Sequence, residues 1–186
     1  MRHLEVRRHS FTKKGDARGR GSHLSGEGVR AARSAGAELG PLAYVAVSEL
    51  PRTLETAIAM GFAVDDILPL GAGYSTAEVA HHDQWTWPRP YVRYRELLDG
   101  GGPLADAARR EFDVWRSAVD RIADGETALI VSHGGRIEPT FVVALPDADV
   151  AAWGPPFSHL DGVRIAFDAD RVDLVAFYRF GRDSAG

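Results

Sequence analysis

The chain has 186 residues, which suits one domain with its own hydrophobic core, and 45% of its residues are hydrophobic. It contains no cysteine, which excludes disulfides, thiolate nucleophiles and cysteine-bound zinc. The net charge of −4 argues against nucleic acid as a partner. No apolar run approaches the roughly 18 residues of a membrane span, and the start, MRHLEVRRHS, does not resemble a signal peptide. We therefore expect a cytoplasmic protein that does not contact membranes.

The charge is unevenly distributed along the chain. Residues 1–33 contain nine Lys or Arg and three Asp or Glu, so this stretch carries a net charge of +6 in an otherwise acidic protein. Such a stretch is often only a solvated surface loop. Together with the motifs below, it favours a site for a small anionic substrate.

Strands and helices alternate through the first half of the sequence. Ser25 is a suitable N-cap, and the spacing of apolar residues predicts a helix from there to about Leu39. Pro51 suits the first turn of a second helix that runs to about Met60. The inward side chains are expected to be Val29, Ala32, Gly36 and Leu39 in the first helix, and Leu54, Ile58 and Gly61 in the second. The predicted strands are residues 4–8 and 44–47, with a further short one at 66–70.

The second half begins with an irregular segment at residues 71–95, which favours a functional loop. Apolar residues three or four apart then predict a helix from Leu104 to Ile122, closed by Gly125. A buried strand at 128–132, a helix at 137–145 and a hairpin of 163–167 with 172–178 complete the chain. We predict one domain, residues 1–186, with a three-layer α/β/α fold, a largely parallel sheet and a C-terminal antiparallel hairpin.

Basic or imidazole side chains stand where predicted strands end or helices begin. His9 follows the first strand, Arg52 lies in the first turn of a helix, and His133 follows a buried strand. Ligands of α/β sheets bind beyond the carboxyl ends of the strands, and helix N-termini attract phosphate. These residues therefore predict a binding site for a phosphate dianion.

Four segments carry a specific resemblance. Arg8-His9-Ser10 matches Arg-His-Gly except for Ser10, and residues 24–28 resemble Leu-Thr-x-x-Gly. Residues 48–57 match Ser-Pro-x-x-Arg-x-x-x-Thr-Ala at Ser48, Arg52, Thr56 and Ala57, with proline shifted to position 51. Residues 132–135 read Ser-His-Gly-Gly. In this order, the segments resemble the histidine phosphatase (phosphoglycerate-mutase-like) family.

The resemblance implies a mechanism for this chain. His9 would be the nucleophile and form a phosphohistidine that water hydrolyses. Arg8, Arg52 and His133 would bind the phosphoryl oxygens, with His133 donating to one of them during transfer. The enzyme would be a metal-independent phosphatase that needs no cofactor, acting on a small phosphomonoester, phosphoanhydride or phosphohistidine.

The general acid is less well defined by the sequence. Members of the family usually carry a glutamate in a Gly-x-x-Glu-Gly context, which is absent here. Glu78 is the candidate general acid and Asp83 the alternative, although either could be an ordinary loop carboxylate. His81 and His82 beside Asp83 could suggest a metal site, but adjacent ligands on a regular element point apart, so we expect no metal there.

Two other functions stay open. One is a phosphoryl transferase of the phosphoglycerate mutase type, which would return the phosphoryl group to a second position of its substrate. The other is a module that binds a phosphorylated ligand without turnover, because a fold does not determine a function by itself.

Overall fold

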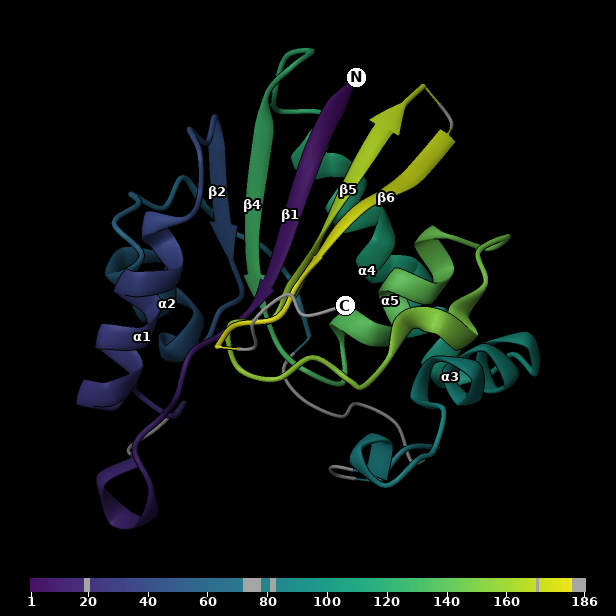
Figure 1. Cartoon of the computed structure of the whole chain (residues 1–186), viewed down its shortest axis with the longest axis horizontal. Coiled ribbons are helices and arrows are strands. Elements are labelled where there is room, and N and C mark those ends of the chain that lie inside the picture. Colours follow the sequence, from purple (N-terminus) through teal and green to yellow (C-terminus); the bar gives the residue numbers. More distant parts are fainter. Residues whose placement is uncertain (19–20, 72–77, 81–82, 170, 182–186) are drawn as a thin grey trace.

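A computed structural model describes residues 1–18, 21–71, 78–80, 83–169 and 171–181 (Figure 1). Within these residues, the strands form one six-stranded sheet in the order β3-β2-β4-β1-β5-β6. The pairs β1–β4, β2–β4 and β2–β3 are parallel. β5 runs antiparallel to both of its neighbours, β1 and β6. The strands are β1 (Arg2–Arg8), β2 (Tyr44–Val47), β3 (Asp66–Ile67), β4 (Thr127–Ser132), β5 (Gly162–Asp168) and β6 (Arg171–Tyr178).

Helices cover both faces of this sheet (Figure 1). On one side lie α1 (Gly26–Ala37) and α2 (Pro51–Ala59). On the other lie α3 (Pro90–Asp99), α4 (Pro103–Val119) and α5 (Ile137–Ala144). Short 3₁₀ turns are η1 (Gly15–Arg18), η2 (Asp83–Trp85) and η3 (Val150–Trp153). The predicted three-layer α/β/α architecture with its C-terminal antiparallel hairpin is confirmed.

The central strands are buried on both faces because their side chains alternate between two apolar clusters. Val45 and Val131 belong to the cluster that includes residues of α1 and α2. Ala46 and Ile130, one position away, belong to the larger cluster with α3, α4 and α5. This explains why β4 reads as a continuous apolar run in the sequence.

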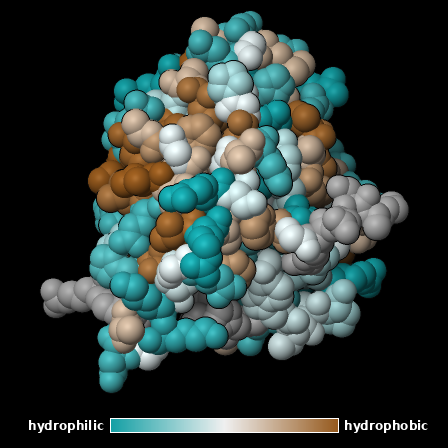
Figure 2. All heavy atoms as spheres, turned by 60° about the vertical axis from the view of Figure 1, so that its left-hand side comes forward, coloured by the Kyte–Doolittle hydropathy of each residue, from teal (hydrophilic) through white to brown (hydrophobic). Residues whose placement is uncertain are grey.

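The inward faces of α1 and α2 were partly mispredicted. Val29 and Ile58 are 37% and 58% exposed, and Figure 2 shows hydrophobic side chains among hydrophilic ones on this side of the molecule. Small residues bring the two helices together instead. A Cβ on Gly36 would lie only 2.1 Å from the Met60 carbonyl oxygen, so the backbones approach too closely for large side chains between them.

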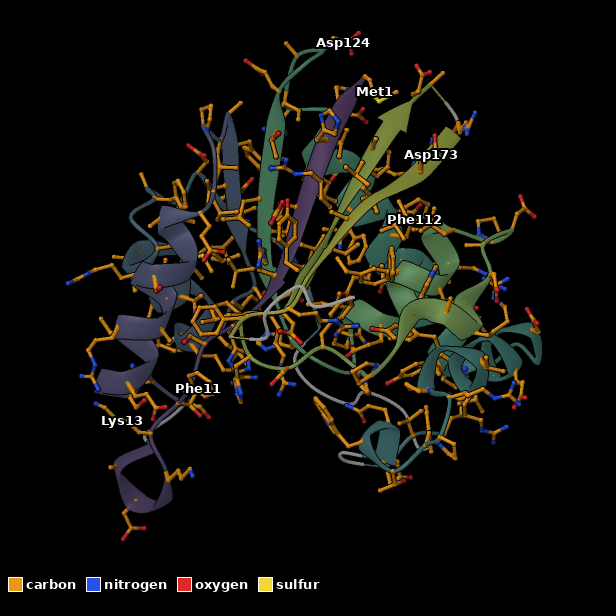
Figure 3. The ribbon with its side chains drawn as sticks, viewed as in Figure 1. Met1, Phe11, Lys13, Phe112, Asp124 and Asp173 are labelled. Carbon is orange, nitrogen blue, oxygen red and sulfur yellow. The ribbon has the colours of Figure 1, made fainter. Side chains whose placement is uncertain are left out.

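Two predictions on the α3–α4 side were also wrong. Residues 90–95, expected to be irregular, begin α3, which buries Tyr91, Tyr94 and Leu98 at helical spacing. The proline and glycine residues around this segment concealed that period. α4 ends at Val119, well before Gly125. The Gly125 N–H instead donates to the carbonyl of Met1, which directly precedes β1 (Figure 3).

No helix in the described parts of the chain has both the length and the apolar character needed to cross a membrane.

Candidate active site

The two histidines predicted at strand ends lie next to each other because of the register between β1 and β4. Arg8 is opposite Ser132 in this parallel pair, so His9 and His133 each follow by one residue. The His9 N–H donates to the Ser132 carbonyl at 3.0 Å, and the two imidazole centroids are 5.3 Å apart. The sheet therefore brings together residues that are far apart in the sequence.

The His9 ring is held in one tautomer by the backbone carbonyl of the next residue, Ser10. Its Nδ1 lies 2.8 Å from the Ser10 carbonyl oxygen, which can only accept, so Nδ1 carries the proton and Nε2 keeps its lone pair. Burial, followed by the neighbouring His133, holds the pKa of His9 well below its usual range, and Arg8 and Arg52 lower it further. A neutral imidazole with an available Nε2 lone pair is the form that a nucleophile requires.

Ser10, which departs from the glycine of the motif, turns its side chain into the protein. Its Oγ donates to the Gly28 carbonyl at 2.8 Å, and its N–H donates to Thr56 Oγ1 at 3.0 Å. Gly28 allows this contact between α1 and the chain after β1, because a Cβ there would lie 2.0 Å from the Phe11 carbonyl oxygen. The serine is thus bonded to α1 and α2, and its hydroxyl has a partner inside the protein.

Both ring nitrogens of His133 have partners. Arg52 Nε donates to Nδ1 at 3.2 Å, so the proton of the neutral ring is on Nε2, which lies 2.7 Å from Ser48 Oγ. Burial lowers the pKa of His133 to about 3, and the charges of Arg52 and Arg8 contribute to this shift. His133 is therefore neutral at physiological pH, like His9.

Arg8 lies under the loop that precedes β5. Its Nη1 donates to the Phe157 carbonyl at 2.7 Å, and its guanidinium lies directly over Gly134, where a Cβ would be 2.8 Å from Cζ. The Nε of Arg8 is buried and has no hydrogen-bond partner among the residues that the structure describes. A buried cationic donor without a partner is the kind of group that an anionic ligand satisfies.

Arg52 completes the cluster from the first turn of α2. Besides its bond to His133, its Nη1 donates to the Gly21 carbonyl at 2.9 Å. Two permanently charged guanidiniums and two neutral imidazoles thus meet at the carboxyl ends of β1 and β4. This combination suits a phosphate dianion, and the arginines can bind its oxygens in bidentate fashion.

Comparisons with known proteins show a likeness at the level of the fold. No family model matches the sequence, and no curated protein matches it significantly. Among solved structures, a mycobacterial glucosyl-3-phosphoglycerate phosphatase solved with VO3 superposes with a TM-score of 0.68 at 21% identity, covering 96% of this chain and 100% of that one. A phosphoserine phosphatase from Entamoeba histolytica, solved with 3-phosphoglyceric acid, gives 0.66 at 17% identity, with 95% and 96% covered. YhfR from Bacillus stearothermophilus gives 0.65 at 24% identity, with 94% and 95% covered.

The chain has the histidine phosphatase fold. The fold implied by the four short motifs is confirmed across nearly the whole chain.

Within the histidine phosphatase fold of this chain, Glu78 contacts the start of α4. Its Oε2 accepts the Leu104 N–H at 2.8 Å, where a carboxylate is favourable because the first N–H groups of a helix have no partner within it. Its role as general acid stays a prediction. The alternative, Asp83, begins η2, and its carbonyl accepts from Thr86.

The candidate metal residues His81 and His82 lie outside the described residues. Within the described part, no three histidine, aspartate or glutamate side chains are grouped as metal ligands would be.

Sequence reasoning missed one imidazole beside His9. The ring centroid of His159 is 5.5 Å from that of His9 and 4.7 Å from that of Phe11. His159 lies just before β5, and β5 runs antiparallel to β1, so the start of β5 adjoins the end of β1. The sequence indicated the hairpin but not its pairing with β1, so nothing in it placed His159 at this edge. Ser48 is a second residue that the structure adds to the site, because its hydroxyl contacts His133. In the sequence it was only one position of a motif.

Proposed function

We propose that this chain is a metal-independent phosphatase that hydrolyses a small phosphorylated compound through a phosphohistidine at His9. The observation that carries the proposal is the His9 tautomer, with Nδ1–H donated to Ser10 and the Nε2 lone pair available among two arginines. The neighbours' names support the chemistry, since two of them are phosphatases of phosphorylated metabolites.

In the first step, His9 Nε2 attacks phosphorus, an N–P bond forms, and the P–O bond to the leaving group breaks. The departing oxygen takes up a proton, for which Glu78 is the candidate donor. Arg8 and Arg52 bind the equatorial oxygens and stabilise their negative charge during transfer, which a divalent cation does in other phosphoryl-transfer enzymes. In the second step, water attacks phosphorus and gives a proton back to the group that protonated the leaving oxygen, and the N–P bond breaks. Inorganic phosphate leaves and His9 returns to its starting form.

His133 can serve this reaction by moving its proton. When the phosphoryl group takes over the Arg52 Nε–H, the His133 Nδ1 loses its donor. Ser48 Oγ is a hydroxyl and can donate to Nε2 as readily as it accepts from it. His133 can then carry its proton on Nδ1 and donate it as a hydrogen bond to a phosphoryl oxygen.

The covalent intermediate provides the test. Rapid denaturation during turnover of radiolabelled phosphate esters should trap phosphate on the protein, stable in base and labile in acid. His9→Ala should abolish both trapping and phosphate release, while His3→Gln, near the other end of β1, should leave both unchanged. Trapped phosphate that survives acid, or turnover by His9→Ala, would contradict the mechanism. A chain that binds phosphate esters but never releases phosphate would be a binding module, and return of the label to a second substrate position would indicate a mutase.

A further inference from the structure

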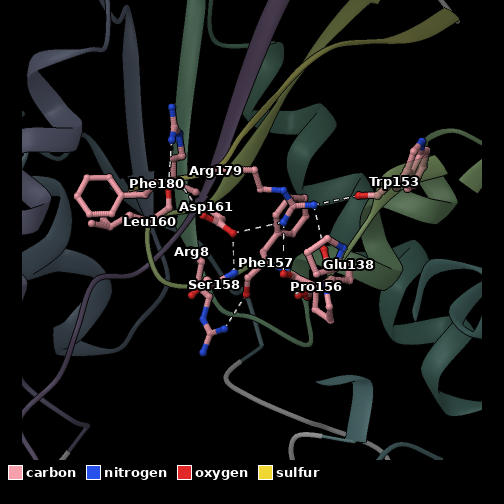
Figure 4. Close-up of polar contacts among 12 residues, drawn as sticks. Arg8, Glu138, Trp153, Pro156, Phe157, Ser158, Leu160, Asp161, Arg179 and Phe180 are labelled. Carbon is pink, nitrogen blue, oxygen red and sulfur yellow. Dashed lines mark hydrogen bonds and ion pairs between the residues drawn. The ribbon is translucent and has the colours of Figure 1, made fainter. Parts of the chain in front are cut away.

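The Arg8 guanidinium is held between two stretches of backbone that are far apart in the sequence. Its Nη1 donates to the Phe157 carbonyl at 2.7 Å, in the loop before β5 (Figure 4). It also lies against Gly134, just after β4, where a Cβ would be 2.8 Å from Cζ. The direction in which Arg8 presents its remaining N–H groups therefore depends on where these two stretches of backbone lie.

One buried carboxylate, that of Glu138, is bonded to both stretches. Glu138 is in the first turn of α5 and is fully buried. Its Oε2 accepts the N–H of Gly135, the residue after Gly134, at 2.6 Å, and its Oε1 accepts the Phe157 N–H at 3.0 Å. Phe157 therefore links the two charged side chains through its backbone, because its N–H is bonded to Glu138 and its carbonyl to Arg8.

Capping of α5 accounts for only one of these two bonds. A glutamate near the start of a helix often accepts an N–H group of the residues that lead into it, and the bond from Gly135 is of this kind. Phe157 lies 19 residues further along the chain than Glu138, in a loop outside the helix. A side chain with bonds to the backbone on both sides of Arg8 suits a role in holding that arginine in place.

The charge of Glu138 also complements that of Arg8. Burial raises the pKa of Glu138, whereas the positive charge of Arg8 and the N–H groups of Gly135 and Phe157 act to lower it. A buried cation is costly unless a nearby anion compensates it, and Arg8 is only 9% exposed. The carboxylate of Glu138 thus supplies part of this compensation when no phosphate is bound.

We propose that Glu138 is a positioning residue for phosphate binding, which acts through Arg8. Its carboxylate fixes the Phe157 carbonyl and the backbone at Gly134, and these fix the guanidinium that binds the phosphoryl oxygens. Glu138 is completely buried, so the substrate contacts Arg8 and not Glu138 itself. The proposal rests on the phosphate site of the function proposed above. A misplacement of about 1 Å in a group that binds the reacting phosphoryl can cost about 10²-fold in rate.

Glu138→Gln tests this role. An amide has a single accepting oxygen, so one of the two N–H groups bonded to Glu138 would face an NH₂ donor. The quantities to measure are the Kd of inorganic phosphate and the single-turnover rate of phosphoenzyme formation from nitrophenyl phosphate. We expect the variant to bind phosphate about tenfold more weakly and to form phosphoenzyme about 10²-fold more slowly.

A double-mutant cycle with Arg8→Ala separates positioning from general stability. In the Arg8→Ala background, Glu138→Gln should change both quantities less than about twofold, because the group through which it acts is missing. Glu138→Asp keeps the carboxylate on a shorter side chain and is measured in the same cycle, so the test does not depend on the folding of one variant.

Val119→Ala is the control for loss of stability. Val119 is a buried residue at the end of α4, and its carbonyl accepts from Arg2 at the start of β1, away from the site. The variant should lower the thermal unfolding temperature and leave phosphate binding and phosphoenzyme formation unchanged.

The outcomes distinguish the two proposals. Equal losses with and without Arg8, or no loss in Glu138→Gln, would overturn the positioning role. Coupled losses in phosphate binding, in a chain that forms no phosphoenzyme, would support the role of Glu138 in binding and overturn the phosphatase function. An unmodified chain that does not bind inorganic phosphate would overturn both.

Discussion

The ends of β1 and β4 place histidines in equivalent positions with different surroundings. Each strand is parallel to the other, and each imidazole comes one residue after the paired positions Arg8 and Ser132. At the end of β1, the His9 Nδ1 is bonded to a backbone carbonyl, so the ring keeps one tautomer. At the end of β4, the partners of His133 are side chains, Arg52 and Ser48.

Under the proposed function, this difference would give the two histidines different roles. A carbonyl can only accept, so the tautomer of His9 is fixed and its Nε2 lone pair is always available. A hydroxyl accepts or donates, and an arginine side chain can move to a ligand, so the proton of His133 can shift between its nitrogens. His9 thus suits attack on phosphorus, while His133 suits a hydrogen bond that forms with the bound phosphoryl group.

The largest effect expected from this comparison is on the rate of His133 variants. His133→Gln should lower kcat by about 10²–10³, the usual effect of losing one donor to developing negative charge. It should still form acid-labile phosphoprotein, which His9→Ala should not. Steady-state kinetics and trapping on the same variants check this. Failure of His133→Gln to form any phosphoenzyme would show that both histidines are needed for attack.

A second expectation concerns stability in acid. The folded chain keeps His133 neutral down to a pKa of about 3, whereas the ordinary value is 6.5, and the pKa of His9 is also lowered well below 6.5. Below about pH 6.5 the unfolded chain therefore binds protons that the folded chain does not. The free energy of unfolding should therefore decrease as the pH is lowered, by up to about 1.4 kcal/mol per pH unit for each histidine.

Urea unfolding between about pH 7 and pH 5 measures this slope. His133→Gln should remove the contribution of one histidine from this slope. An unchanged slope in His133→Gln would show that His133 is not held neutral.

Removing the hydroxyl partner of His133 should have a smaller effect. Ser48→Ala leaves Nε2 without its hydrogen bond, which typically amounts to about 1–2 kcal/mol, or roughly tenfold in kcat. Ser117→Ala, on the exposed side of α4, is the matched control and should retain full activity. If the Ser48 variant has the same kcat as the unmodified chain, the hydroxyl of Ser48 does not decide which ring nitrogen of His133 carries the proton.

The smallest effect on activity is expected at Ser10. Because its hydroxyl donates to Gly28, Ser10→Gly should change kcat less than about threefold, while the lost buried hydrogen bond lowers the free energy of unfolding by about 1 kcal/mol. Kinetics and urea unfolding on one preparation give both quantities. A large loss of activity without loss of stability would show that the serine contacts the substrate.

Local sequence patterns predicted most of the helices and strands. They failed where the packing between helices determines which side chains are buried. Ser25 caps α1 and Pro51 opens α2 as predicted, since both signals act within one turn. Apolar spacing predicted the buried faces of these helices only in part. Ala32 and Gly36 are buried as expected, but Val29 and Ile58 are exposed, because the two backbones approach each other through Gly36. α3 was missed because its tyrosines lie among prolines and glycines that are typical of loops.

The sequence by itself determined the positions of His9, Arg8, Arg52 and His133, because strand ends and helix starts leave short-range signals. Only the tertiary structure decided the tautomers, since these depend on atoms such as Ser48 Oγ and the Ser10 carbonyl. It also decided the place of His159, through the antiparallel pairing of β5 with β1. Pairing between distant strands depends on the burial of the whole sheet, which no local pattern contains.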